Sequence, residues 1–446
     1  MNLSNIQAED LDLYALIKKE SIRQKEGLEL IPSENYTSPA VMEAMGSILT
    51  NKYSEGYAKK RYYGGNEFID NIELIACERA KKLFGVPHVN VQPYSGSPAN
   101  LAIYMATCQP GDVVLGLNLT DGGHLTHGWK VSATGIFYKT FGYHTKPDGR
   151  VDFDEVRKLA EEHKPKLIWC GATAYMYEIE YEQFAEIADS VGAFLAADIA
   201  HVAGLIAAGA HKSPAEYAHI ITTTTHKTLR GPRGGMIMAT AKGLKKDPDL
   251  GDKMDKAVFP GLQGGPHDHQ TAAIAIALKE AATESFKIYG HQIVKNAKAL
   301  AKTLLAKGIK LVGNGTENHL LLLDLVPVFG PGGGVFGSEV LEAAGMTANK
   351  NTIPGEPGSP FYPSGVRMCT PALTTRGFKE KEMEKVGEWI AAAIFEVKSY
   401  HLPEKKEERG TYIAKFKKDI AANENLKKIR AEIKELCKNF PVPGIE

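Results

Sequence analysis

TTTTHKTLRGPRGG, at residues 222–235, is the segment from which the fold prediction starts. Its β-branched threonines continue an apolar run at 219–223, a pattern typical of a buried strand. The chain then passes through His226 and Lys227 into a loop of glycines and arginines. In α/β sheets, ligands collect at the carboxyl ends of strands, so Lys227 is expected to lie at a ligand site.

Short apolar runs of the same kind recur upstream, and amphipathic segments separate them. Runs bounded by glycine, proline and polar residues favour strands buried on both faces, and the amphipathic segments favour covering helices. This alternation predicts an α/β domain built around a mostly parallel sheet. The expected strands are 112–116, 166–170 and 193–198, and the expected helices are 152–163 and 181–191.

The length of 446 residues predicts two domains, or three. We expect an N-terminal helical arm at residues 1–30, a large α/β domain at 31–280 and a smaller α+β C-terminal domain at 281–446. A long helix at 269–307 is expected to join the last two domains. The glycine-rich segment FGPGGGVFG, at 329–337, is expected to be a flexible surface loop.

The charge balance excludes several classes of protein. Lys plus Arg and Asp plus Glu both number 53, so no general electrostatic attraction to nucleic acid or anionic membranes is expected. No run approaches the roughly 18 apolar residues of a membrane-spanning helix, and the N-terminus has no signal-peptide pattern. The five cysteines are scattered without metal-type spacing, so we expect no metal site, reduced thiols and a cytoplasmic location.

Lys227 differs from the other lysines in its surroundings, which are a strand end, hydroxyls and glycines rather than other charges. Most lysines are solvated surface charges. A lysine at a desolvated strand end can lose its proton and form a Schiff base with an aldehyde.

Asp198 is expected to emerge at the end of a buried strand, because it follows the apolar run in AFLAADIAHVAGL, 193–205. The usual fate of such an aspartate is to cap a turn. Its functional interpretation is a partner for a pyridinium nitrogen, since a fixed carboxylate keeps that nitrogen protonated and lets the ring accept electrons. His201, three residues later, is expected near the same strand end.

A phosphate site is suggested by VQPYSGSPAN, 91–100, which follows a short strand-like segment and precedes a helical pattern. Ser95, Gly96 and Ser97 offer hydroxyls and backbone N–H groups at a helix N-terminus, although Ser–Gly–Ser also makes ordinary turns. The cradle, the acidic residue and the lysine together match the needs of an aldehyde cofactor that carries a phosphate.

Seven segments resemble the signature motifs of the serine hydroxymethyltransferase family, in that family's order and spacing. They are SENYTS (33–38), NKYSEGYAKKRYYGG (51–65), GGHLTHG (122–128), DIAHVAGL (198–205), TTTTHKTLRGPRGG (222–235), FPGLQGGP (259–266) and SGVRMCTPA (364–372). The resemblance covers nearly the whole chain.

The resemblance implies the fold type I architecture of pyridoxal-phosphate enzymes, with a mostly parallel seven-stranded sheet covered by helices. It implies a homodimer at least, with each active site shared between subunits. Lys227 would carry pyridoxal 5'-phosphate as an imine, Asp198 would pair with the pyridine nitrogen, and His124 would stack on the ring. The other implied cofactor contacts are Ser95, Gly96 and Ser97 at the phosphate, Gly264 and Gly265 from the partner subunit, and Thr173, His201 and Thr224.

The implied reaction is the reversible transfer of the serine hydroxymethyl carbon to tetrahydrofolate, which gives glycine and 5,10-methylenetetrahydrofolate. Arg367, with Ser33, would bind the amino-acid carboxylate, since a planar guanidinium grips a carboxylate through two parallel hydrogen bonds. Glu55 would be the acid–base carboxylate, acting across the subunit boundary. The remaining implied residues are Tyr53, Tyr63, His226 and Arg233 around the substrate, and Tyr62, Leu119, Leu125 and Asn351 at the folate.

Three features depart from the family's usual pattern. Thr173 stands where the family has serine, residues 176–178 read MYE, and Trp129 follows the GGHLTHG motif. The Thr173 hydroxyl still permits a hydrogen bond to the cofactor. In the family, the loop that contains Trp129 lies beside the folate site, so these changes bear on the use of folate. We expect the use of folate to be retained.

Two other functions stay open at this point. A related aldolase or transaldolase that acts on β-hydroxy amino acids without folate would share Lys227 and Asp198, so fold alone does not decide the function. A non-catalytic binding protein on the same scaffold would be expected to have lost Lys227 or Arg367, and both are present. Folate dependence and the preferred amino acid discriminate between these functions.

Overall fold

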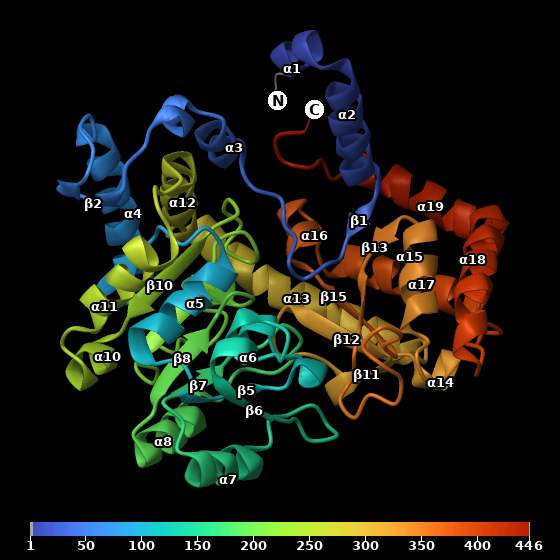
Figure 1. Ribbon diagram of the computed structural model, residues 1–446. Helices are drawn as coiled ribbons and strands as arrows, with labels where there is room; N and C mark the ends of the chain where they lie inside the picture. Colours follow the sequence, from blue (N-terminus) through green and yellow to red (C-terminus); the bar gives the residue numbers. More distant parts are fainter. Residues whose placement is uncertain (1–2, 446) are drawn as a thin grey trace. The chain divides into compact units, whose positions relative to one another are not determined.

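The computed structural model describes residues 3–445, which form two compact units (Figure 1). One unit covers Ala40–His291. The other joins the described residues up to Pro39 to those from Gln292 onward. The predicted boundaries after residues 30 and 280 lie near these divisions, and the N-terminal arm belongs to the same unit as the C-terminal residues.

A seven-stranded sheet organises the unit of residues 40–291. The strand order is β4-β10-β9-β8-β7-β5-β6, and the run from β9 to β6 is parallel, while β10 is antiparallel to both of its neighbours. The predicted fold class is therefore confirmed. The strands are β4 (His88–Asn90), β5 (Val113–Leu117), β6 (Lys139–Tyr143), β7 (Leu167–Cys170), β8 (Phe194–Asp198), β9 (Ile220–Thr224) and β10 (Gly235–Ala239).

Strand β9 shows why the threonine run folds as a buried strand. All five of its residues are buried, and their hydroxyls are satisfied inside the protein. Thr222 Oγ1 donates to Asn100 Oδ1 at 2.7 Å, and Thr223 Oγ1 donates to the Thr224 carbonyl at 2.8 Å. A buried hydroxyl is tolerated only with such partners, so the threonines combine β-branched shape with internal hydrogen bonds.

Helices pack against the sheet, and α5 lies over β8–β10 while α7 and α8 lie over β5–β8 (Figure 1). The predicted helix at 181–191 is confirmed at both ends, and the one at 152–163 begins one residue later because Asp152 is its N-cap. The helices of this unit are α4 (Glu67–Phe84), α5 (Gly96–Thr107), α6 (Ala133–Phe137), α7 (Phe153–His163), α8 (Tyr181–Val191), α9 (Ala203–Ala207), α10 (Ala241–Lys246), α11 (Leu250–Lys256) and α12 (Asp268–Ala281). Short elements are α3 (Pro39–Met45), η1 (Ile48–Asn51), β2 (Gly56–Tyr57), β3 (Lys60–Arg61), η2 (Leu119–Asp121), η3 (Leu125–His127) and the π-helical η4 (Ala257–Leu262).

The single long helix predicted at 269–307 is wrong, because the chain forms two helices, α12 and α13 (Glu284–Ala306). The break falls at Ala282 and Thr283. The Thr283 hydroxyl accepts a hydrogen bond from the Phe286 N–H at 3.3 Å, so it starts a new helix as a capping residue. The boundary between the two units lies within α13.

The other unit contains a four-stranded antiparallel sheet of order β11-β12-β15-β14. The predicted strand at 320–326 is confirmed over residues 320–324 as β12, all of whose residues are buried, whereas Val326 begins a short helix. The strands of the unit are β1 (Leu28–Glu29), β11 (Lys310–Leu311), β12 (Leu320–Asp324), β13 (Met346–Thr347), β14 (Asn349–Asn351) and β15 (Gly365–Cys369). Its other elements are α1 (Ser4–Glu9), α2 (Leu11–Glu26), η5 (Val312–Asn314), α14 (Val326–Phe329), α15 (Gly334–Ala343), α16 (Pro371–Thr375), α17 (Glu380–Glu396), α18 (Lys406–Ala422) and α19 (Glu424–Cys437).

The expectation of a flexible surface loop at 329–337 is wrong. Val335, Phe336 and Gly337 are buried in the first turns of α15, and Phe336 packs edge-to-face on Phe416 with ring centroids 4.9 Å apart. A Cβ at Gly337 would lie 2.4 Å from Leu325 Cδ1. Glycine is therefore needed at this position for close packing. The high glycine content of the segment is also typical of loops, which explains the wrong prediction.

Every helix among the described residues is too short or too polar to span a lipid bilayer.

Candidate active site

Segments that follow several strands of the seven-stranded sheet meet in one cavity with the start of α5. Lys227 lies three residues beyond β9, and Asp198 is the last residue of β8. The motifs that were picked separately in the sequence are thus brought together in space. The cavity is lined by Gly96, Asn100, His124, His127, Ala172, Thr173, Asp198, Ala200, His201, Thr224 and Lys227.

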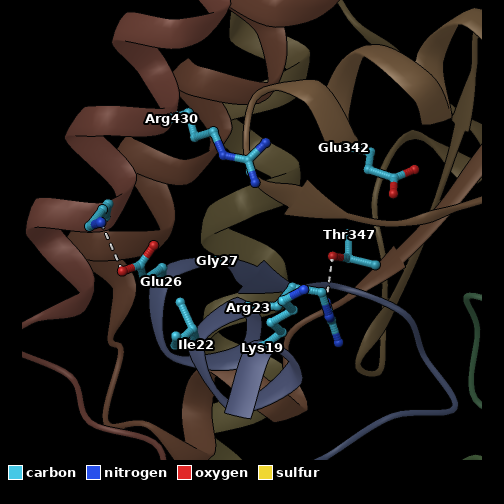
Figure 2. Close-up of a pocket in the computed structure, with 10 residues that line it drawn as sticks. Lys19, Ile22, Arg23, Glu26, Gly27, Glu342, Thr347 and Arg430 are labelled. Carbon is cyan, nitrogen blue, oxygen red and sulfur yellow. Dashed lines mark hydrogen bonds and ion pairs between the residues drawn. The ribbon is translucent and has the colours of Figure 1, made fainter. Parts of the chain in front are cut away.

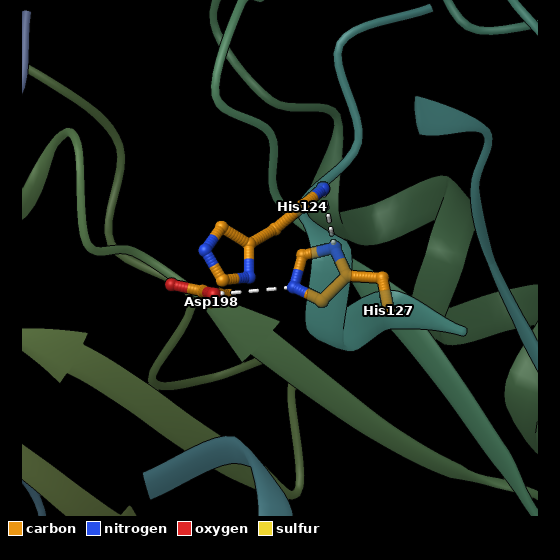
Figure 3. Close-up of side chains that lie close together, drawn as sticks. All are labelled: His124, His127 and Asp198. Carbon is orange, nitrogen blue, oxygen red and sulfur yellow. Dashed lines mark hydrogen bonds and ion pairs between the residues drawn. The ribbon is translucent and has the colours of Figure 1, made fainter. Parts of the chain in front are cut away.

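Asp198 is held by three hydrogen bonds. Its Oδ2 accepts from Asn100 Nδ2 at 2.9 Å and lies 3.1 Å from His127 Nε2 (Figure 3). Its Oδ1 accepts from the Ala200 N–H at 3.0 Å. A carboxylate fixed in this way has one orientation, so the predicted contact with a pyridinium nitrogen would need no rearrangement of the acid.

The pKa of Asp198 lies well below its ordinary range. Burial is the largest influence and acts in the opposite direction. The hydrogen bond from His127 and the electrostatic influence of His127, His124 and Lys227 outweigh burial and favour the ionised carboxylate. Asp198 is therefore an anion at neutral pH.

His124 lies beside Asp198 with a defined tautomer (Figure 3). Its Nδ1 accepts a hydrogen bond from the Thr126 N–H at 3.2 Å and lies 2.7 Å from Thr126 Oγ1. Because a backbone N–H points at Nδ1, the ring proton is assigned to Nε2. The ligand atoms of His124, His127 and Asp198 lie within 4.8 Å of one another, a spacing that a metal ion could also bridge.

Lys227 is nearly buried, with 8% of its surface exposed. Its carbonyl accepts from the Arg230 N–H at 3.0 Å, and Thr228 ties the loop to the end of β8 by donating to the His201 carbonyl at 2.9 Å. The neighbouring His226 is half-buried, and its partial burial, together with Lys227 and Arg233, lowers its pKa to about 3. Its Nδ1 has no hydrogen-bond partner within residues 3–445, as expected of a group that meets a ligand.

The start of α5 fits a phosphate group. Ser95 is the N-cap of this 12-residue helix, but its side chain makes no capping hydrogen bond, so the first N–H groups stay open. A Cβ at Gly96 would lie 2.8 Å from Thr224 Cγ2, which explains the glycine. The helix start, the buried lysine and the anionic Asp198 therefore fit a phosphorylated pyridine aldehyde.

Comparison with known proteins bears on the identity of this site. The family model described as serine hydroxymethyltransferase matches residues 6–390. The serine hydroxymethyltransferase of Acidothermus cellulolyticus is 52% identical over 449 residues, which cover 100% of this chain and 98% of the relative. That of Sorangium cellulosum is 50% identical over 98% of this chain and 96% of its own length, and that of Campylobacter jejuni is 52% identical over 89% and 94%.

The chain belongs to the serine hydroxymethyltransferase family. This confirms the resemblance seen in the motifs and the prediction of a fold type I, pyridoxal-phosphate-dependent glycine hydroxymethyltransferase.

Several residues predicted from the serine hydroxymethyltransferase pattern form a second cluster in the same unit. Tyr53 O–H donates to Glu55 Oε1 at 3.2 Å, and the rings of Tyr53 and Tyr63 meet edge-to-face at 5.3 Å. A Cβ at Gly264 would lie 3.1 Å from Glu55 Oε1, and one at Gly265 would lie 3.0 Å from the Tyr53 ring. In the part of the chain that the structure describes, the lining of the Lys227 cavity includes none of these five residues.

Tyr94 ties this second cluster to the segment that precedes α5. Its O–H donates to the Gly265 carbonyl at 2.7 Å, and its ring stacks on His267 at 4.2 Å with an angle of 6° between the planes. Its N–H donates to Gln263 Oε1 at 2.9 Å. The turn at Gly264 and Gly265 is thus held by the residue directly before Ser95.

The departures from the serine hydroxymethyltransferase pattern have local structural consequences. Thr173 holds the glycine turn before His124, because its N–H donates to the Gly122 carbonyl at 2.7 Å and its hydroxyl to the same oxygen at 3.1 Å. Trp129 lines a small cavity together with Leu119, the predicted folate contact. Of the other predicted folate contacts, Tyr62 and Leu125 are exposed.

Arg367, Ser33 and Asn351 lie in the other unit. Arg367 is on β15, where its Nε donates to Asn349 Oδ1 at 3.2 Å. Burial lowers the pKa of its guanidinium to about 10, which still leaves it positively charged at neutral pH. Asn351 ends β14, and its Nδ2 donates to the Thr352 carbonyl at 2.7 Å.

A larger cavity in that unit, about 470 Å³, is a weaker candidate for the active site (Figure 2). Its lining residues Lys434 and Glu26 pair with one another at 2.8 Å, and Arg23 donates to Thr347 Oγ1 at 3.2 Å. The cavity contains none of the predicted site residues.

Two polar residues that line the Lys227 cavity were missed in the sequence, namely His127 and Asn100. Both hydrogen-bond to Asp198, from positions 71 and 98 residues away in the chain. Both lie inside quoted motifs, GGHLTHG and VQPYSGSPAN, so the signal was present. The pattern gave no reason to pair either with Asp198.

Proposed function

We propose that this chain is an active serine hydroxymethyltransferase. The reaction is the reversible transfer of the hydroxymethyl carbon of serine to tetrahydrofolate, which gives glycine and 5,10-methylenetetrahydrofolate and serves one-carbon and glycine/serine metabolism. The observation that carries the proposal is one cavity that combines Lys227, Asp198 and the open N-terminus of α5. The names of the relatives support this reaction over the folate-independent alternative.

The Lys227 cavity is proposed to hold pyridoxal 5'-phosphate. Lys227 Nζ would hold the aldehyde carbon covalently, with release of the aldehyde oxygen as water, and the anionic Asp198 would keep a proton on the pyridine nitrogen. The bound cofactor supplies an electron sink for the bond that breaks at the amino-acid α-carbon. The proposed phosphate contacts are Ser95, Gly96, Ser97, Gly264 and Gly265, and the proposed ring contacts are His124, Thr173, His201 and Thr224.

The amino acid is proposed to be oriented by Arg367 with Ser33. A guanidinium that grips the carboxylate sets which bond at the α-carbon stands perpendicular to the ring. Glu55 moves the proton of the serine hydroxyl, and Tyr53, which donates to Glu55 Oε1, orients that carboxylate. His226, Tyr63 and Arg233 complete the substrate site, and Tyr62, Leu119, Leu125 and Asn351 contact the folate.

We further propose a cytoplasmic homodimer whose active sites each draw Tyr53, Glu55, Gly264 and Gly265 from the partner subunit. The aromatic residues around the β2–β3 hairpin support an interface there. Tyr62 and Phe68 are 75% and 73% exposed, and such apolar surface is typical of a contact with another chain. The functional division we propose is an arm at 1–30, a cofactor domain at 31–280 and a C-terminal domain at 281–446.

An absorbance titration with pyridoxal 5'-phosphate tests the cofactor proposal. The wild-type protein should gain a yellow band that borohydride removes, because reduction of the bond to Lys227 ends its conjugation. Lys227→Ala should gain no such band. Lys242→Ala, which removes a surface lysine paired with Asp189, is the control and should behave as the wild type. A normal band in Lys227→Ala would refute the assignment.

Tetrahydrofolate tests the second substrate. Serine cleavage should depend on tetrahydrofolate, and binding should change the fluorescence of Trp129, which lies beside Leu119. Trp129→Phe keeps an apolar ring there and should abolish the fluorescence change while cleavage continues. Serine cleavage that is indifferent to tetrahydrofolate would favour the aldolase function instead.

A further inference from the structure

Asn100 is buried in α5, with 1% of its surface exposed, and all of its side-chain hydrogen-bonding atoms are engaged. Its Nδ2 donates to Asp198 Oδ2 at 2.9 Å and to Thr126 Oγ1 at 2.8 Å. Its Oδ1 accepts from Thr222 Oγ1 at 2.7 Å. Because the ionised Asp198 carboxylate can only accept, the end of the amide that faces it is the nitrogen. One amide therefore bridges three segments, β8, η3 and β9.

The first consequence concerns Asp198. Its Oδ2 receives Asn100 Nδ2 and His127 Nε2 together, while Oδ1 receives the Ala200 N–H. Removal of the Asn100 donor would leave the carboxylate with one side-chain partner and freedom to turn about its Cβ–Cγ bond.

The second consequence concerns His124. Thr126 Oγ1 accepts from Asn100 Nδ2 at 2.8 Å and lies 2.7 Å from His124 Nδ1. The Thr126 N–H donates to the same nitrogen at 3.2 Å. The ring of His124 is thus held against Thr126, a residue that Asn100 holds in place.

We propose that Asn100 is a positioning residue for the cofactor ring. Its single amide fixes the carboxylate that is to meet the ring nitrogen and, through Thr126, the imidazole that is to stack on the ring face. This inference rests on the proposed function, because it needs pyridoxal 5'-phosphate as the ligand of the Lys227 cavity.

At position 100, the side chain must donate to Asp198 and Thr126 at one end and accept from Thr222 at the other. Asn100→Asp keeps the shape and the acceptor for Thr222, but it sets a second carboxyl group against Asp198. The charged groups that face this pair are His127, His124 and Lys227, and all are positive or neutral. When the new carboxyl group is protonated, it can donate to Asp198 in place of the amide, so acid should restore the arrangement.

The test compares apoprotein variants by titration with pyridoxal 5'-phosphate and by thermal melting. At about pH 8, Asn100→Asp and Asn100→Ser should bind the cofactor about tenfold or more weakly than the wild type. Between about pH 8 and pH 6, the deficit of Asn100→Asp should shrink, whereas that of Asn100→Ser should not. Thr222→Val, which frees the acceptor end of the amide, should give a smaller loss in the same direction.

Asn296 provides a matched control for loss of stability. It is also fully buried, and its Nδ2 donates to Thr374 Oγ1 and the Phe378 carbonyl, both at 2.9 Å. Asn296→Ser should lower the melting temperature and leave cofactor affinity unchanged. The positioning role is refuted if Asn100→Ser and Asn100→Asp melt lower but bind the cofactor as the wild type does, or if the deficit of Asn100→Asp does not vary with pH. Failure of the wild type to bind would instead refute the proposed function.

Discussion

His127 Nε2 lies 3.1 Å from Asp198 Oδ2 at the carboxyl end of β8, where His127 is buried and the Asp198 side chain is 11% exposed. The pair keeps Asp198 ionised, because burial alone would raise its pKa, yet the carboxyl group titrates below its usual range. Trp169 stacks on one face of the His127 ring, with ring centroids 5.1 Å apart and 10° between the planes. The imidazole is thus held at its face by the indole and at its Nε2 edge by Asp198.

Substitution of His127 should affect both stability and cofactor binding. The folded-state pKa of Asp198 lies below its unfolded value of about 3.9, so the carboxylate stabilises the fold above that pH and the gain is lost on acidification through it. His127→Phe should lower the free energy of unfolding by about 3 kcal/mol at neutral pH, since the buried carboxylate loses one of its three hydrogen-bond donors and keeps only Asn100 and the Ala200 N–H. Denaturant unfolding measures this value. His127→Gln, which can keep an N–H donor, should lose less, and equal losses in the two variants would contradict the role of the hydrogen bond.

His226 should make stability depend on pH. Burial, Lys227 and Arg233 lower its pKa to about 3, whereas an unfolded histidine titrates near 6.5. As the pH falls through about 6.5, the unfolded chain gains a proton that the folded chain does not, so stability falls by up to about 1.4 kcal/mol per pH unit. His226→Asn should flatten the plot of unfolding free energy of the apoprotein against pH.

His219 offers a control for this pH effect, because burial lowers its pKa to about 4 and it precedes β9, at the end opposite His226. His219→Asn should also flatten the pH profile of stability, but cofactor affinity should stay unchanged. An unaltered profile in His226→Asn would show that the pKa of this ring is the same in the folded and the unfolded protein.

The strand ends of the large sheet could be predicted because, at each end, an apolar run is followed by glycine, proline or polar residues. Asp198 and Lys227 were placed correctly at such ends. The pairing of Asn100 with Asp198 could not be read from the sequence, since it arises only when α5 packs over β8 and β9. The glycine-rich composition around Gly337 led to the wrong prediction of a loop, because glycine is required there for close packing and not for flexibility.

Arg367→Lys should separate substrate binding from cofactor binding. A lysine ammonium keeps the charge but cannot form the two parallel hydrogen bonds of a guanidinium with a carboxylate. The KM for serine should rise by about tenfold or more, while the titration with pyridoxal 5'-phosphate should match the wild type. Asn349→Ala removes only the acceptor of Arg367 Nε, so it should raise KM less. A normal KM in Arg367→Lys would place the carboxylate elsewhere.

Mixing of two inactive variants should test whether the active site is shared between subunits. Lys227→Ala and Glu55→Gln should each abolish most of the turnover as separate homodimers. If Glu55 serves the partner's cofactor site, a mixed dimer has one site with both residues intact. Random re-association of equal amounts should then restore about a quarter of the wild-type rate, because half of the dimers are mixed and each has one good site.

A mixture of Lys227→Ala and Asp198→Ala is the control. Both residues line one cavity of the same chain, so each site of a mixed dimer keeps one of the two substitutions. In that mixture every site contains a defect and no activity should return. Absence of recovery in the first mixture, with mixed dimers verified by differently tagged chains, would place Glu55 and Lys227 in the same subunit's site.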